Sequence, residues 1–291
     1  TGQGLIIRTV DGDVTPPSWT VGFTTPRDLT AIHFSDANHG TAVGRGNYIW
    51  RTVDGGTTWI EQTSLRDNQA FSGDLQDVFF ATMKKGWAVG SDLAIFGVIF
   101  HTSDGGQNWI LQAGSGGVNT LANTLLGLSF ADSTTGTVVG WAASQGTGSI
   151  FHTTDTGQNW TPQSQVGFLY NVHLITRFEA WAVGGQLPGP GPLVLHTTDA
   201  GQVWADLSSA LTGAGTSGLF DVHFVDALNG TIVGDGGLIF RTTNGGQSWT
   251  KETNPAGAVR LMDVHLVNAD IGWAVGNDVN QIGAPVILRR Q

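Results

Sequence analysis

The chain of 291 residues contains no cysteine, and this absence excludes a disulfide framework, a thiolate metal site and a cysteine nucleophile. It also has no apolar run near the roughly 18–20 residues that a membrane-spanning helix needs. The formal net charge of −10 argues against nucleic acid, because duplex binding rests on cationic groups that displace counterions. We therefore expect neither a nucleic-acid partner nor a transmembrane segment.

Lysine and glutamate are also scarce, with three residues of each, whereas glycine occurs 43 times. Gly costs a helix about 1 kcal/mol per position relative to Ala, and Lys and Glu are good helix formers. Val, Ile, Thr, Phe and Trp, which strands prefer, are abundant. The hydrophobic fraction of 40% is ordinary for a globular chain. This composition predicts an all-β protein.

A nine-residue box, (R/H)-T-x-(D/N)-x-G-x-x-W, occurs five times, from Arg51 to Trp249. Asp followed by Gly is typical of a hairpin turn, because Asp bonds nearby backbone N–H groups and Gly tolerates positive φ. Such turns could also bind calcium, but an element that is repeated in every unit indicates a structural role. We therefore predict a structural role for the Asp or Asn and the Trp of each box: Asp54, Trp59, Asp104, Trp109, Asp155, Trp160, Asp199, Trp204, Asn244 and Trp249.

A second motif lies between the boxes. An apolar strand ends at Phe or Leu, a small residue follows six positions later, and Gly follows four positions after that, in all six copies. The final glycines are Gly44, Gly90, Gly140, Gly184, Gly234 and Gly276. Each unit therefore holds four strands, which we name A to D in chain order; strand D begins at the box Trp.

Four-stranded units with a Gly and Trp signature predict a β-propeller. The repeats predict a single domain, residues 1–291, forming a six-bladed β-propeller of four-stranded antiparallel blades. The ring is expected to be closed by N- and C-terminal strands, with residues 19–23 as strand D of the last blade. Because residues 5–8 and residues 286–289 both fit strand C, seven blades are the alternative.

The box T-S-D-G-G-Q-N-W at residues 102–109 and its other copies are similar to Asp-box (bacterial neuraminidase) repeats. The longer unit at residues 221–249, D-V-H-F-V-D-A-L-N-G-T-I-V-G-D-G-G-L-I-F-R-T-T-N-G-G-Q-S-W, resembles the photosystem II stability/assembly-factor propellers. This resemblance implies a non-enzymatic, protein-binding accessory subunit or assembly factor. Its partners would be subunits of a membrane-bound photosynthetic or redox complex, on the periplasmic or lumenal side.

Asp boxes also occur in sialidases and some xyloglucan hydrolases, so a carbohydrate-active or glycan-binding propeller is the alternative function. Resemblance to sialidases implies an arginine triad, a Tyr nucleophile supported by Glu, and an acid/base Asp. The chain has only two tyrosines, Tyr48 and Tyr170, and Glu61 and Glu252 fall on outer D strands. Two Asp carboxyls at about 5–10 Å could still perform glycosidase chemistry. We predict no catalytic residue and no enzymatic activity.

Histidines occupy two repeated positions, one on strand A and one at the box start. Clustered His can bind transition metals. Here each position supplies one His per blade, so no two of them have the close sequence spacing of a pair of metal ligands. Hydrogen bonding between blades is the interpretation we favour over an ion near the channel, and we predict no metal and no cofactor. The positions are His33, His173, His223 and His265 on strand A, and His101, His152 and His196 at the box start.

The B–C and D–A connections vary in length, whereas the A–B and C–D connections hardly do. In an up-and-down blade the variable connections lie on one face, and loops on a rigid scaffold are where binding tends to reside. Several are apolar, which predicts either loops folded over the blade tops or a protein-docking surface. The docking candidates are Leu93, Ile95, Phe96, Trp141, Leu187, Pro188, Pro190, Val279 and Ile282.

The chain begins at Thr1 without Met, which indicates a processed or trimmed product. An acidic, Cys-free propeller rich in Trp and Gly suits a secreted, lumenal or periplasmic protein peripheral to a membrane.

Overall fold

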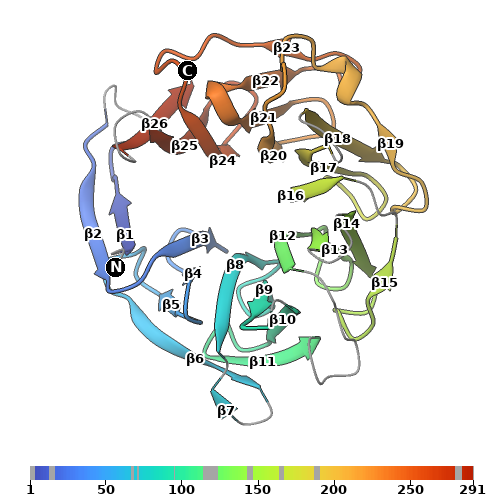
Figure 1. Cartoon of the computed structure of the whole chain (residues 1–291). Coiled ribbons are helices and arrows are strands. Elements are labelled where there is room, and N and C mark those ends of the chain that lie inside the picture. The colour runs from blue at the N-terminus through green and yellow to red at the C-terminus, as the bar shows by residue number, and fades with distance from the viewer. Residues whose placement is uncertain are drawn as a thin grey trace. The chain divides into compact units, whose positions relative to one another are not determined.

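The computed structural model describes residues 4–12, 17–66, 69–70, 72–94, 96–113, 124–142, 147–163, 167–186, 191–278 and 284–290 (Figure 1). These residues form strands and two short 3-10 helices, η1 (Ser208–Ala210) and η2 (Asp235–Gly237). The all-β prediction is confirmed. The chain divides into two compact units, Thr1–Leu125 and Leu126–Gln291.

The first unit holds two blades and an N-terminal hairpin. The hairpin pairs β1 (Gly4–Arg8) with β2 (Thr20–Thr25). The first blade is β3 (Leu29–Phe34), β4 (Gly40–Gly44), β5 (Ile49–Thr52) and β6 (Ile60–Arg66), and the second is β8 (Gly73–Phe80), β9 (Gly86–Asp92), β10 (Gly97–Thr102) and β11 (Asn108–Ala113). Their outermost strands, β6 and β11, pair in parallel, and β7 (Gln69–Ala70) adds to β6, so one nine-stranded sheet joins both blades.

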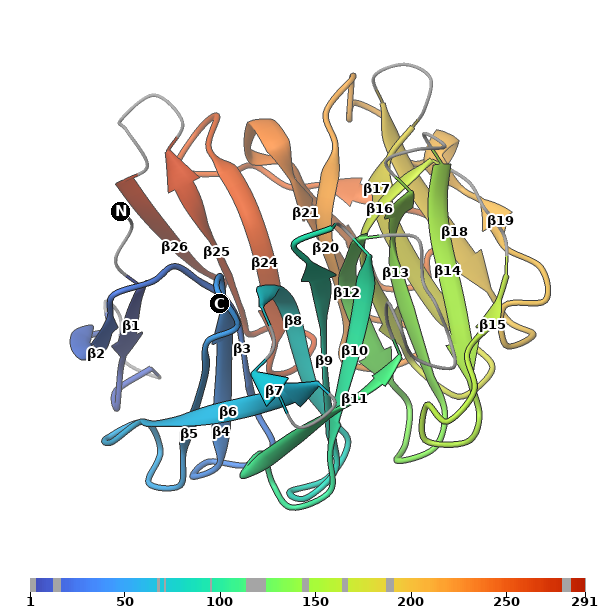
Figure 2. The same cartoon turned by 60° about the horizontal axis from the view of Figure 1, so that its bottom comes forward.

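The second unit holds four blades, one after another along the chain (Figure 2). They comprise β12 (Thr124–Phe130), β13 (Gly136–Ala142), β14 (Thr147–Thr153) and β15 (Thr161–Pro162); β16 (Phe168–Leu174), β17 (Ala180–Gly185), β18 (Pro192–Thr197) and β19 (Ala205–Asp206); β20 (Leu219–Phe224), β21 (Gly230–Gly234), β22 (Ile239–Thr242) and β23 (Thr250–Lys251); and β24 (Arg260–Leu266), β25 (Gly272–Asp278) and β26 (Ala284–Arg290).

Two blades and four blades make six, so the six-bladed β-propeller class is confirmed. The last blade differs from the prediction, because the described residues give it three strands. The segment expected as its fourth strand, residues 19–23, falls mostly in β2, whose hydrogen-bonded partner is the nearby β1. A single domain and a ring closed by terminal strands would join the two units, and both stay predictions.

The repeated Phe, Gly and Trp form one packing motif in the core of a blade. Phe80, at the end of strand A, meets the box Trp109 edge to face at a centroid distance of 5.7 Å, and three other blades repeat this geometry. A Cβ on Gly86 would come within 2.7 Å of the Phe80 ring. Leu174 is followed by Ala180, whereas Leu266 is followed by Gly272, where an added Cβ would come within 2.6 Å of the Leu266 side chain. The small residue therefore makes room for the side chain that ends strand A.

Among the described residues, no helix has both the length and the apolar character needed to cross a membrane.

Candidate functional site

The inner strands carry a β-bulge near their first residues. In five blades the register of strands A and B shifts by one residue, which leaves a bulged residue on strand A. A bulge re-aims a side chain, and bulges are frequent next to functional sites. The bulged residues are Thr30 and Gln76 in the first unit, and Tyr170, Phe220 and Met262 in the second; Leu126 has the equivalent position in sequence.

In the second unit these bulges help to build a row of four half-buried rings, which we call the aromatic row: Trp141, Phe168, Tyr170 and Phe220. The ring centroids of Trp141 and Phe168 are 4.8 Å apart, as are those of Phe168 and Tyr170. Tyr170 meets Phe220 across the next blade boundary at 5.0 Å. The inner strands β16, β20 and β24 contact one another in order, so the row crosses adjacent blades (Figure 1).

One cation ends the aromatic row. The guanidinium carbon of Arg260 lies 5.4 Å from the Phe220 centroid, and Arg260 Nε donates to Asp235 Oδ1 at 3.3 Å. Both charged side chains stay partly exposed, at 43% and 39%. Burial raises the pKa of Tyr170 above its usual range. The row therefore presents the surface of apolar rings, and the charge of the one cation beside it is balanced by Asp235.

The predicted docking residues lie in different environments. Trp141 belongs to the aromatic row, and Leu93 is exposed in the turn after β9. Phe96 is partly buried, and its backbone N–H donates to Asp92 Oδ1 at 3.0 Å, which closes that turn. Six candidates lie outside the described residues: Ile95, Leu187, Pro188, Pro190, Val279 and Ile282.

The remaining members of the row were missed by sequence reasoning, which looked at loops and not at strand ends. For Tyr170 and Phe220, though not for Phe168, a signal was present four positions before the last residue of strand A. There the first unit has Thr30 and Gln76, whereas the second has Leu126, Tyr170, Phe220 and Met262. Without the bulge, however, strand alternation does not reveal which of these side chains reach the surface.

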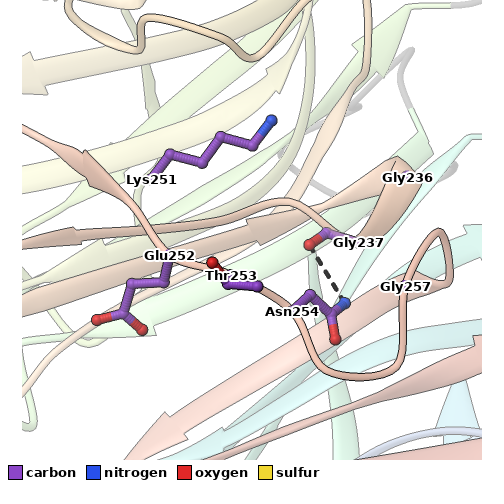
Figure 3. Close-up of a pocket in the computed structure, with 7 residues that line it drawn as sticks. All are labelled: Gly236, Gly237, Lys251, Glu252, Thr253, Asn254 and Gly257. Carbon is purple, nitrogen blue, oxygen red and sulfur yellow. Dashed lines mark hydrogen bonds between the residues drawn. The ribbon is translucent and has the colours of Figure 1, made fainter.

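A pocket of about 380 Å³ lies beside Asp235, between the B–C connection at η2 and the D–A connection after β23 (Figure 3). Its wall includes three glycines, and Asn254 Nδ2 donates to the Gly237 carbonyl at 3.2 Å. Lys251 Nζ donates to the Gly213 carbonyl at 2.8 Å, and Glu252 Oε1 lies 3.9 Å from Arg290 Nε. Both charges are therefore engaged by other parts of the chain, so the pocket alone suggests no chemistry.

The box carboxylates are occupied by their own turns. Asp54 accepts hydrogen bonds from the hydroxyl of Thr52 and from the N–H and hydroxyl of Thr58, at 2.7–2.9 Å. The Thr58 N–H is the largest cause that lowers the pKa of Asp54 to about 2. Asn244 accepts the corresponding bonds through Oδ1. These bonds support the structural interpretation of the box over a calcium site.

Two strand-A histidines of the second unit make hydrogen bonds to the next blade. His173 has a backbone hydrogen bond with Phe224, which opposes the lowering of its pKa by burial. The Leu266 N–H donates to His223 Nδ1 at 3.3 Å. Ser129 Oγ takes this role toward the Leu174 N–H. Among the described residues, no group of three or more His, Asp or Glu could hold a metal ion.

The groups needed for sialidase chemistry are dispersed. The arginines of the second unit face different partners: Arg177 faces Asp132, Arg241 faces Asp270 and Arg260 faces Asp235. Glu179 Oε1 is 3.2 Å from His196 Nε2, and Tyr170 contacts aromatic rings.

A buried carboxyl beside a second carboxyl is also structural. Asp221 is buried and accepts backbone N–H groups of Val222 and Val264 and the amide of Asn171. Burial, and then the neighbouring carboxylate of Asp263, raise its pKa well above the usual range. Asp221 therefore links three inner strands.

Comparisons with known proteins agree with the repeats. Residues 15–113 match the family described as Photosynthesis system II assembly factor YCF48, and the chain resembles this family. No curated protein sequence matches the chain.

Solved structures show the β-propeller fold. YCF48 from Cyanidioschyzon merolae is 18% identical over 91% of this chain and 96% of its own, with a TM-score of 0.52. A structure of YCF48 bound to D1 peptide is 18% identical over 91% and 93%, with a TM-score of 0.48. The GH74 xyloglucanase from Xanthomonas campestris is 12% identical over 89% and 46%, with a TM-score of 0.62.

Proposed function

We propose that this protein is a non-enzymatic, protein-binding propeller. It serves as an accessory subunit or assembly/stability factor of a membrane photosynthetic or electron-transfer complex, on the periplasmic or lumenal side. The match of residues 15–113 to the assembly-factor family supports the type of complex. The observation that carries the binding role is the aromatic row.

The row has the chemistry of a docking surface. Aromatic residues and Arg are enriched at protein interfaces and dominate binding hot spots. The four rings are half-buried and support one another at 4.8–5.0 Å, so a partner would find them already ordered. Met262, at the equivalent bulge of the next inner strand, is a further apolar side chain that is 47% exposed.

The described side chains support a non-enzymatic role. Catalysis requires an acid, base or nucleophile poised toward a substrate. Here the buried carboxyl of Asp221 and the imidazole of His223 accept hydrogen bonds from the neighbouring blade.

Glycan binding is the second candidate, because sugar rings also pack their C–H faces on exposed aromatic rings. Asp-box propellers include carbohydrate-active enzymes, and the fold similarity to a xyloglucanase is consistent with that class. A glycan array with the purified chain tests this candidate directly.

The experiment that tests the proposal is co-isolation from mild-detergent extracts of the source membranes, followed by a native gel. We expect co-migration with subunits of a photosynthetic or redox complex. Replacing Tyr170 and Phe220 together by Ala should reduce it. Phe178→Ala is the matched control, because Phe178 is a 59% exposed aromatic residue on an A–B turn. Migration as a free 30.6 kDa chain, together with chemical cross-linking that captures no subunit, would overturn the proposal.

A further inference from the structure

We propose that the aromatic row accepts a basic segment of a partner protein, whose Arg or Lys side chains stack on the rings. This inference rests on the proposed function, because it takes the partner to be a protein. In this arrangement the partner supplies the positive charge of the interface, and this chain supplies the rings.

Charge favours a cationic partner. Residues 126–291 contain six Lys and Arg and twelve Asp and Glu, which gives the second unit a formal charge of −6. An excess of one sign raises the association rate of segments with the opposite charge and repels those with the same charge. The described residues place one cation, Arg260, against the row, and Asp235 neutralises it. On the part of this surface that the structure describes, an acidic segment would find no cluster of cations.

The molecule already contains the contact that we propose. Arg260 extends from the start of β24 across the ring of Phe220, with its guanidinium carbon 5.4 Å from the centroid. A cation within about 6 Å of an aromatic centroid is attracted by the ring quadrupole, and Trp is the strongest partner. Trp141 lies at the other end of the row. We take the Arg260–Phe220 pair as the internal example of how a partner arginine would bind.

The spacing of the rings suits an extended segment. Successive centroids are 4.8, 4.8 and 5.0 Å apart. In an extended chain, alternate residues point to the same side and lie about 6.6 Å apart. Long, flexible cationic side chains at those residues can cover the difference from the ring spacing, so each can reach a different ring. A segment with Arg or Lys at alternate positions and small apolar residues between them therefore fits the row.

Three synthetic nine-residue peptides test this inference. They share the same small apolar residues and carry Arg, Gln or Glu at alternate positions. Titration calorimetry with the full chain should show the Arg peptide binding about tenfold more tightly than the Gln peptide, and the Glu peptide more weakly than either. Added salt should weaken the binding of the Arg peptide more than that of the other two peptides.

Substitutions identify the surface. Tyr170→Leu and Phe220→Leu keep apolar area but remove a ring, so each should weaken the Arg peptide several-fold and leave the Gln peptide nearly unchanged. Phe178→Leu, on an A–B turn, should change neither. Equal affinity of the three wild-type complexes would overturn the inference without reference to any variant, and so would unchanged Arg-peptide binding by folded Leu variants.

The two proposals fail separately. Co-migration with a photosynthetic complex, without preference for the Arg peptide, removes only the basic-segment inference. Selective binding of the Arg peptide by a chain that captures no complex subunit removes only the proposed function.

Discussion

At the scale of single residues, the two repeated small positions on strand B have different physical causes. The first faces an aromatic ring of strand A, as Gly86 faces Phe80. The second lies at the bulge, where the backbone of strand A approaches closely. A Cβ on Gly184 would collide with the carbonyl oxygen of Phe168, and Gly90 meets Asp74 in the same way. The spacing was visible in the sequence, but these reasons require the structure.

We expect Gly184→Ala to lower the free energy of unfolding by about 2–3 kcal/mol, because a backbone carbonyl cannot move aside as a side-chain end does. Gly218→Ala is the matched control, since an added Cβ there meets no atom within 4 Å. Urea unfolding curves of the two variants measure the difference. Equal stability of both variants would show that the close approach is not a constraint.

At the scale of elements, the box is a complete hydrogen-bonded turn. Thr52 Oγ1 donates to Asp54 and accepts the Gly56 N–H at 2.9 Å, while the Gly55 N–H donates to the Asn38 carbonyl of the A–B turn. The boxes thereby tie the C–D turn to the A–B turn of the same blade. This could be predicted from sequence, because every partner except the A–B turn lies within a few residues.

Asp104→Ala should destabilise the chain by about 1–3 kcal/mol, because the hydroxyl of Thr102 and the backbone N–H groups of Gln107 and Asn108 lose their acceptor. Asp104→Asn should cost less than about 1 kcal/mol, since Asn244 performs this role in another box. Thermal unfolding compares the two variants. A similar loss from both would mean that charge matters more than the acceptor.

The inner strands of the second unit make stability depend on pH. Burial lowers the pKa of His173 to about 4 and of His223 to about 2, from 6.5 for the unfolded chain. The unfolded state therefore binds more protons below pH 6.5, and stability should fall as pH falls from about 6.5 towards 4. At pH 5 the expected loss is on the order of 2 kcal/mol per histidine.

Urea unfolding between pH 7.5 and 4.5 measures this loss. His173→Ser should flatten the profile, whatever its absolute stability, because serine does not titrate in this range and Ser129 holds the equivalent position on β12. A wild-type profile that is level from pH 7 to 5 would contradict the assignment of neutral histidines.

At the scale of the whole molecule, six blades repeat one pattern, yet the residues divide into two compact units. Neighbouring repeats in such proteins usually couple through shared interfaces. A single domain over residues 1–291 predicts one cooperative unfolding transition. The parallel pairing of β6 with β11 was not predicted, because it joins strands from different blades.

Gly90→Ala in the first unit and Gly184→Ala in the second test this prediction. If the chain is one domain, both variants should shift the midpoint of the same transition, followed by tryptophan fluorescence and by circular dichroism. Two transitions, each shifted by only one of the variants, would show two domains.

The sequence by itself determined the β class, the repeated unit, the box turns and the absence of a thiol site, and it favoured six blades over seven. These depend on composition and on partners a few residues apart, which the repeats make visible several times. Only the tertiary structure decided which side chains meet on the surface. Tyr170 and Phe220 belong to different blades, and a bulge on each inner strand sets the direction of their rings. Contacts of this kind depend on how blades pack, and neither spacing nor alternation along one strand encodes them.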